Sequence, residues 1–132
     1  MKSINETLIK YVNEIGSNEK FWKSEYKNTK NAVKDIIGSN NLRQLAVLAL
    51  NADCYEEFKL FMQYKTAKGN GWDSYFDKEK KERFGDVIIS YLDKIYEASN
   101  KNDDEALNNI SRFFGYLFWR KRVIGGKGEK SK

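Results

Sequence analysis

The sequence predicts an all-α fold, a single-domain bundle of five to six helices over residues 1–126, followed by a basic disordered tail at residues 127–132. Three observations support this fold class. The chain contains no proline, which favours long uninterrupted helices. Apolar residues recur at helical spacing in at least four segments, and no segment alternates as a half-buried strand does. A length of 132 residues is typical of one domain.

The first two helices are predicted from a capping signal and from glycines. Ser3 followed by Glu6 forms a capping box, and the apolar residues behind it keep helical spacing as far as Gly16. A second helix is suggested over residues 21–37, ending at Gly38, and its apolar residues are clearest in the second half.

The third and fourth helices are predicted to form a pair. Asn40 or Asn41 can cap the third helix, whose apolar residues lie nearly all round it, so we expect it to be the central and most buried helix. The fourth helix spans residues 55–68 and stops at Gly69 and Gly71. Because only a residue or two separates the two helices, we expect an antiparallel hairpin.

The remaining elements follow from charge and periodicity. The mixed charges of residues 78–83 are typical of a solvated helix surface, and residues 84–96 form the clearest amphipathic helix of the chain. The last helix is expected to begin at a cap by Asp103 or Asp104 and to end at the glycine pair 125–126.

The predicted hairpin places Arg43 near Lys65 and Lys68. An arginine in the first turn of a helix is disfavoured by the helix dipole, by about 0.3–1 kcal/mol, so Arg43 requires an anionic partner. One interpretation is an exposed arginine that pairs with a nearby carboxylate. The other is a phosphate site built from two helix ends, where Tyr64 or Trp72 could stack on a nucleobase.

The net charge of +5 is concentrated at the C-terminal end. Residues 106–132 carry seven cations and one acid, whereas the first 105 residues are nearly balanced. Three aromatic residues, Tyr116, Phe118 and Trp119, precede three consecutive cations, and at this spacing such aromatics are more often core than platforms for bases. The three cations are expected to meet solvent or a polyanion, and complementation of the helix dipole is the alternative. The cations of this region are Arg112, Arg120, Lys121, Arg122, Lys127, Lys130 and Lys132.

Composition also excludes several classes of function. The absence of histidine removes Ser-His-Asp triads, Cys-His pairs and HExxH zinc sites. The single cysteine, Cys54, cannot form an internal disulfide or a multi-cysteine metal site. We therefore expect no enzyme, no cofactor and no metal. The sequence has no run of 18 apolar residues and no signal-peptide pattern, so we expect a cytoplasmic protein with no membrane partner.

Three motifs, in this order, resemble the small subunits of type III CRISPR effector complexes, in particular the Csm-type small subunit. Residues 39–43 place Leu-Arg at a helix start, residues 64–69 combine an aromatic with Ala, a cation and Gly, and residues 112–127 form an aromatic-rich helix ending in Gly-Gly-Lys. The similarity covers residues 36–128. It departs from the family at Lys68, where an arginine is usual, at Gly115, where an acid is typical, and by one extra residue between Ser39 and Arg43. The Cmr-type or another type III small subunit therefore stays an alternative.

The resemblance implies a non-catalytic protein that stacks head to tail along a guide RNA and holds guide and target RNA by their phosphates, together with other subunits of the complex. The alternatives are a helical DNA-binding regulator and a protein–protein scaffold module. The regulator is disfavoured because Glu56 and Glu57 would begin its recognition helix. The candidate RNA-binding residues are Arg43, Lys65, Lys68, Arg112, Arg120, Lys121 and Arg122.

Overall fold

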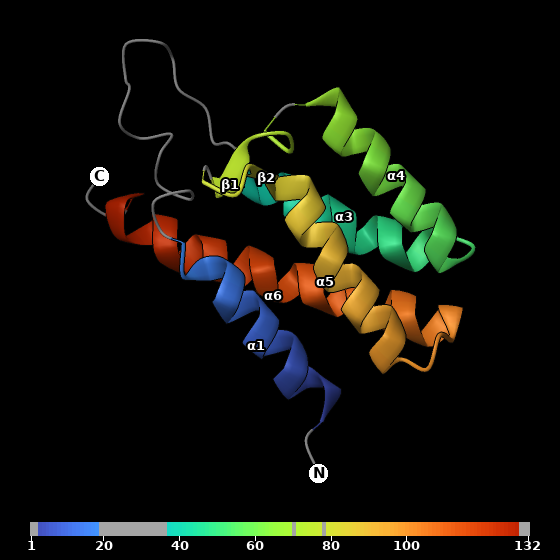
Figure 1. The fold of residues 1–132 in the computed structure, drawn as a ribbon. Helices are drawn as coiled ribbons and strands as arrows, with labels where there is room; N and C mark the ends of the chain where they lie inside the picture. The colour runs from blue at the N-terminus through green and yellow to red at the C-terminus, as the bar shows by residue number, and fades with distance from the viewer. Residues whose placement is uncertain (1–2, 19–36, 70, 78, 130–132) are drawn as a thin grey trace.

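The backbone is helical through most of the chain, as the sequence predicts. The structure is a computed structural model that describes residues 3–18, 37–69, 71–77 and 79–129 (Figure 1). The second expected helix, residues 21–37, lies almost entirely outside these described residues. Within them the chain forms five helices and one two-stranded sheet: α1 (Ile4–Gly16), α3 (Ser39–Asn51), α4 (Tyr55–Lys68), β1 (Tyr75–Asp77), β2 (Glu82–Arg83), α5 (Phe84–Ala98) and α6 (Asp103–Glu129).

The long helix α6 is the centre of the bundle. At 27 residues it is about 40 Å long, and α1, α3 and α5 all pack against it, while α4 packs mainly on α5 (Figure 1). Its apolar stripe supplies much of a single core that joins all five helices. The expectation that the third helix is the most buried is therefore wrong. That helix, α3, buries only one face, and on the opposite side Val47 is 55% exposed and Leu50 is 57% exposed.

Helix α1 begins where the capping box predicts. The hydroxyl of Ser3 accepts a hydrogen bond of 3.3 Å from the backbone N–H of Glu6. The helix ends at Gly16, which lies against the aliphatic part of Arg120 on α6, because a Cβ placed there would come within 2.7 Å of Arg120 Cγ. Glycine at this position therefore lets α1 approach α6 closely.

Helices α3 and α4 reverse direction at their short connection, as expected of a hairpin, but they pack little on each other. In Figure 1 they diverge from the turn at residues 52–54, and each packs on a different partner, α3 on α6 and α4 on α5. The first turn of α4 is held from outside the pair, since the backbone N–H of Tyr55 donates to Asp103 Oδ1 at 3.0 Å. The core therefore separates the two helices, because each buries its apolar face against another element.

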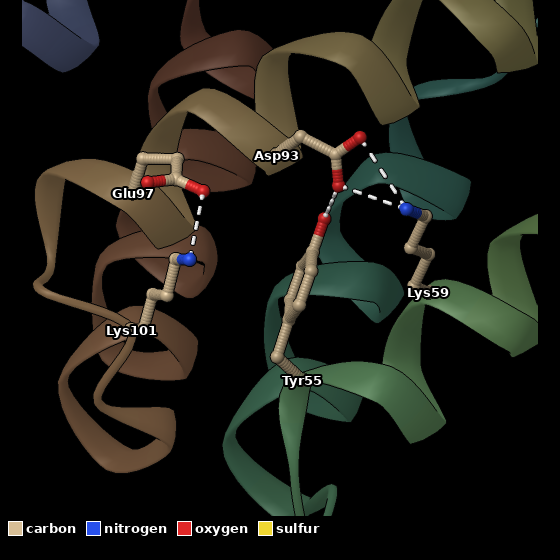
Figure 2. Close-up of polar contacts among 5 residues, drawn as sticks. All are labelled: Tyr55, Lys59, Asp93, Glu97 and Lys101. Atoms are coloured by element: carbon tan, nitrogen blue, oxygen red, sulfur yellow. Dashed lines mark hydrogen bonds and ion pairs between the residues drawn. The ribbon is translucent and has the colours of Figure 1, made fainter.

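A polar junction connects α4 with α5. The hydroxyl of Tyr55 donates to Asp93 Oδ1 at 2.5 Å, and Lys59 Nζ lies 3.1 Å from the same oxygen (Figure 2). Further along the pair, Gly85 lies so close to α4 that an added Cβ would fall 1.8 Å from Thr66 Oγ1. Only glycine allows this approach of the two helices.

The segment before α5 differs from the sequence prediction. Residues 79–83 are not a helix surface but the turn and second strand of a β-hairpin, with Tyr75 opposite Arg83 and Asp77 opposite Glu82. The carboxylate of Asp77 accepts hydrogen bonds from the backbone N–H groups of Glu79 and Lys80, at 3.0 and 3.1 Å. These local bonds stabilise a turn in competition with a helix.

The end of α6 also differs from expectation. The helix does not stop at residues 125–126 but continues to Glu129, so its backbone includes residues 127–129. Glycine lowers helix stability by about 1 kcal/mol per residue relative to alanine without forbidding the helical conformation. No helix among the described residues has the length and apolar content that crossing a bilayer requires.

Candidate nucleic-acid interface

An open groove of about 440 Å³ lies between α3 and α6 and carries two of the predicted cations. Arg43 comes from the second turn of α3, which starts at Ser39 after an N-cap by Gly38, and Arg112 comes from the first half of α6. Both side chains are exposed. The residues lining the groove are Arg43, Ala46, Arg112, Gly115, Tyr116, Phe118 and Trp119.

The periodicity of α6 explains how this groove is built. Arg112, Gly115, Tyr116 and Trp119 follow one another at i, i+3, i+4 and i+7, so they share one face of the helix. That face lies beside the stripe that α6 buries in the core. The groove is therefore a flank of the central helix that α3 covers only in part.

Within the groove, Arg43 contacts one aromatic ring, and two other rings lie beside each other. The guanidinium carbon of Arg43 lies 4.9 Å from the ring centroid of Phe118, a cation–π contact that positions the side chain while its N–H groups can still donate to an anion. The rings of Tyr116 and Trp119 are 5.6 Å apart and tilted by 52°. Trp119 is 64% exposed, so the expectation that this run of aromatics is core is wrong for Trp119.

Lys65 and Lys68 form a second cationic cluster at the end of α4. Lys65 Nζ lies 5.6 Å from the ring of Trp72, and Lys68 Nζ lies 5.8 Å from the ring of Tyr64. Partial burial lowers the pKa of Lys65, and the neighbouring charge of Lys68 lowers it further. A bound anion would relieve that repulsion.

The contacts of this cluster correct two expectations. Trp72 is fully buried, so it is a core residue and not a platform for a base, whereas Tyr64 is exposed. Arg43 contacts α6, while Lys65 and Lys68 contact the rings of α4 and of the turn after it. The structure therefore places Arg43 and Arg112 together in the lining of the groove, and Lys65 and Lys68 form a cluster of their own at the end of α4.

The side chains of the three consecutive cations near the end of α6 lie in three different environments. Arg120 donates from Nη2 to Asn13 Oδ1 of α1 at 2.7 Å, and Arg122 is exposed. Lys121 is only 4% exposed, so the expectation that all three meet solvent or a polyanion is wrong for this residue. Successive residues of a helix are rotated by about 100°, so three in a row cannot share one surface.

Sequence reasoning missed the aromatic part of the groove. It named Arg43 and Arg112 as candidates but not Gly115, Tyr116 and Trp119, which lie beside them. The signal that could have found them is their spacing from Arg112 along one flank of α6.

We also considered the described residues for a metal site and for a reactive thiol. There, no three side chains of Cys, Asp and Glu gather so that they could hold a metal ion. Cys54 is a free thiol of intermediate exposure at the start of α4. The groove is therefore the strongest candidate for a functional site.

Neither a protein-family model, nor a curated protein, nor a solved structure matches this chain.

Proposed function

We propose that the protein is a non-catalytic small subunit of a type III CRISPR effector complex, and that it binds the backbone of guide and target RNA. The observation that carries the proposal is the groove in which Arg43 and Arg112 come together from two separate helices. Both arginines lie in segments of the sequence that resemble this family. Two exposed arginines suit a polyanion, because guanidinium groups donate to phosphate in bidentate geometry.

The proposed interaction is independent of RNA sequence. Phosphate contacts position a nucleic acid without reading its bases. Lys65, Lys68 and Arg122 are further candidate phosphate contacts outside the groove. A subunit of this kind works in the cytoplasm with other subunits of the complex, and copies of it associate head to tail, which requires two different contact faces.

The apolar side chains exposed on α3 and α4 support the protein–protein part of this role. Val47 and Leu50 on α3, and Leu60 on α4, are each more than half exposed. A contiguous patch of such residues is typical of a surface that contacts another protein. The same observation favours the alternative function, a scaffold module that needs no nucleic acid.

A binding experiment separates the proposed RNA-binding subunit from a scaffold module and from a DNA-binding regulator. Fluorescence anisotropy of a labelled single-stranded RNA, titrated with the full chain across a salt series, should show binding that weakens as salt rises. Duplex DNA serves as the second probe, because a DNA-binding regulator would prefer it. A scaffold module would bind neither probe at any salt concentration.

The matched variants test the site itself. Changing both Arg43 and Arg112 to Ala should weaken RNA binding, whereas changing Lys80 and Lys101 to Ala removes the same charge from exposed positions outside the groove. If the two double variants lose affinity equally, the binding is a general effect of charge and the groove is not the site.

A further inference from the structure

Gly115 lies in the groove and has no packing role that explains it. A Cβ at this position would meet nothing within 4 Å, whereas a Cβ at Gly16 or Gly85 would collide with a neighbouring side chain. Gly115 also lies outside the positive φ region, which Gly69 and Gly71 occupy. Glycine inside a helix is less stable than alanine, so this residue lowers stability without serving the fold. What the missing side chain provides is open space at the floor of the groove, where an outside group can approach the helix closely.

The aromatic rings beside that space are available to a ligand. Trp119 lies one turn after Gly115 on the same face of α6, and Tyr116 is the next residue and also lines the groove. Trp119 exposes most of its surface. Their tilted arrangement leaves them without a parallel stacking partner in each other. The ring of Phe118, in contrast, is occupied by the guanidinium of Arg43.

The charge of the groove selects the kind of ligand. Its lining includes Arg43 and Arg112 but no carboxylate. A group that fits must therefore combine an anion for the arginines with a flat, unsaturated ring for Trp119 and Tyr116. A nucleotide has both parts, and a volume of about 440 Å³ is within the range of small-ligand pockets.

We propose that this groove takes one unpaired nucleobase of single-stranded RNA, which stacks on the exposed ring of Trp119 beside Gly115 and meets the tilted ring of Tyr116 at its edge, while Arg43 and Arg112 hold its phosphate. The inference rests on the proposed function and deepens it, because it adds a contact to the base where the proposed function requires only contacts to the backbone. Stacking of this kind tolerates every base, since each has a flat aromatic face.

The decisive probe needs no change to the protein. The full chain is titrated with a labelled single-stranded RNA of twelve uridines and with the same strand in which every base is absent. Stacking contributes about 5- to 150-fold in affinity per base, so the intact strand should bind more tightly by a factor in that range. Equal affinity for the two strands would overturn the proposal and leave the backbone contacts of the proposed function in place.

Two variants locate the effect in the groove. Gly115→Leu fills the floor, and Trp119→Ala removes the exposed ring, so each should abolish the preference for the intact strand. Val123→Ala is the matched control, because it removes an exposed apolar side chain of α6 that does not line the groove. Circular dichroism melting curves establish that each variant is folded.

The outcomes are distinguishable. If both groove variants keep the preference, the base binds elsewhere and the proposal is wrong, even though the chain binds RNA. If the unchanged chain binds neither strand, the proposed function fails and the inference fails with it. If a groove variant does not fold, the comparison of the intact and base-free strands on the unchanged chain still decides the question.

Discussion

The junction between α4 and α5 makes a quantitative prediction about stability. Tyr55 is almost fully buried, and its hydroxyl donates to the carboxylate of Asp93, which is only half-buried and also pairs with Lys59 (Figure 2). A hydrogen bond to a charged group contributes about 1.5–3 kcal/mol, and a buried polar group left without a partner costs about 1–3 kcal/mol. Because only Tyr55 is fully buried, losing the acceptor and losing the donor should lower the free energy of unfolding by different amounts.

We expect removal of the acceptor to be worse than removal of the donor. Tyr55→Phe breaks the bond but leaves Asp93 in contact with water, so the free energy of unfolding should fall by about 1.5 kcal/mol. Asp93→Ala breaks the same bond and strands the Tyr55 hydroxyl in the core, so the loss should reach about 3 kcal/mol. The double variant removes the stranded hydroxyl and should be more stable than Asp93→Ala alone by about 1.5 kcal/mol.

Urea unfolding followed by circular dichroism measures all three values. Lys101→Ala is the control, because the exposed pair of Lys101 with Glu97, 3.7 Å apart, should contribute less than about 1 kcal/mol (Figure 2). The reasoning is refuted if Asp93→Ala is no worse than Tyr55→Phe. It is also refuted if the losses of the two single variants simply add in the double variant.

Three further predictions concern two glycines, Tyr91 and the groove. Gly85→Ala should destabilise the fold by about 1–3 kcal/mol in urea unfolding because it overpacks α5 against α4, whereas Gly115→Ala should stabilise it by about 0.5–1 kcal/mol. Burial of Tyr91, with help from a hydrogen bond to a carboxylate, raises its pKa to about 12, whereas an unfolded tyrosine ionises near pH 10. The protonated hydroxyl of Tyr91 therefore contributes fully to the free energy of unfolding below pH 10, and this contribution is lost as the pH rises towards 12. Tyr91→Phe removes the titrating group, so the urea midpoint of the variant should fall less steeply between pH 10 and 12. If RNA binding neutralises about four phosphates, the logarithm of affinity should fall with the logarithm of salt concentration at a slope near −2.8, and losing Arg43 and Arg112 together should reduce that slope to about −1.4. An unchanged slope would exclude the two arginines as phosphate contacts.

The sequence predicts where the helices of this fold lie along the chain better than it predicts which elements pack against one another. Helix α1 follows from Ser3 and Glu6, and α5 from a clear apolar period, because these signals lie within one segment. The place of α3 could not be predicted, because a helix that is apolar nearly all round does not indicate which side it will bury. The β-hairpin was missed because the side chain of Asp77 favours a turn inside a segment whose charges suggested a helix.

The candidate site shows the same division. Arg43 and Arg112 were named from local features, but their common groove depends on the packing of α3 against α6. Lys121 was predicted wrongly, since a cation in a basic run was expected at the surface and is instead buried. Which side of a helix end faces the core is decided by tertiary packing, which local charge does not encode.

The carboxylate of Asp103 makes the stability of one helix depend on a distant part of the chain. It belongs to the first turn of α6, yet it accepts a hydrogen bond from the first turn of α4, 48 residues earlier. An isolated α4 therefore lacks this cap until the distant start of α6 has arrived. Because this bond joins the starts of α4 and α6, we expect the first turns of these two helices to open together, so that their amide protons exchange with solvent in one event.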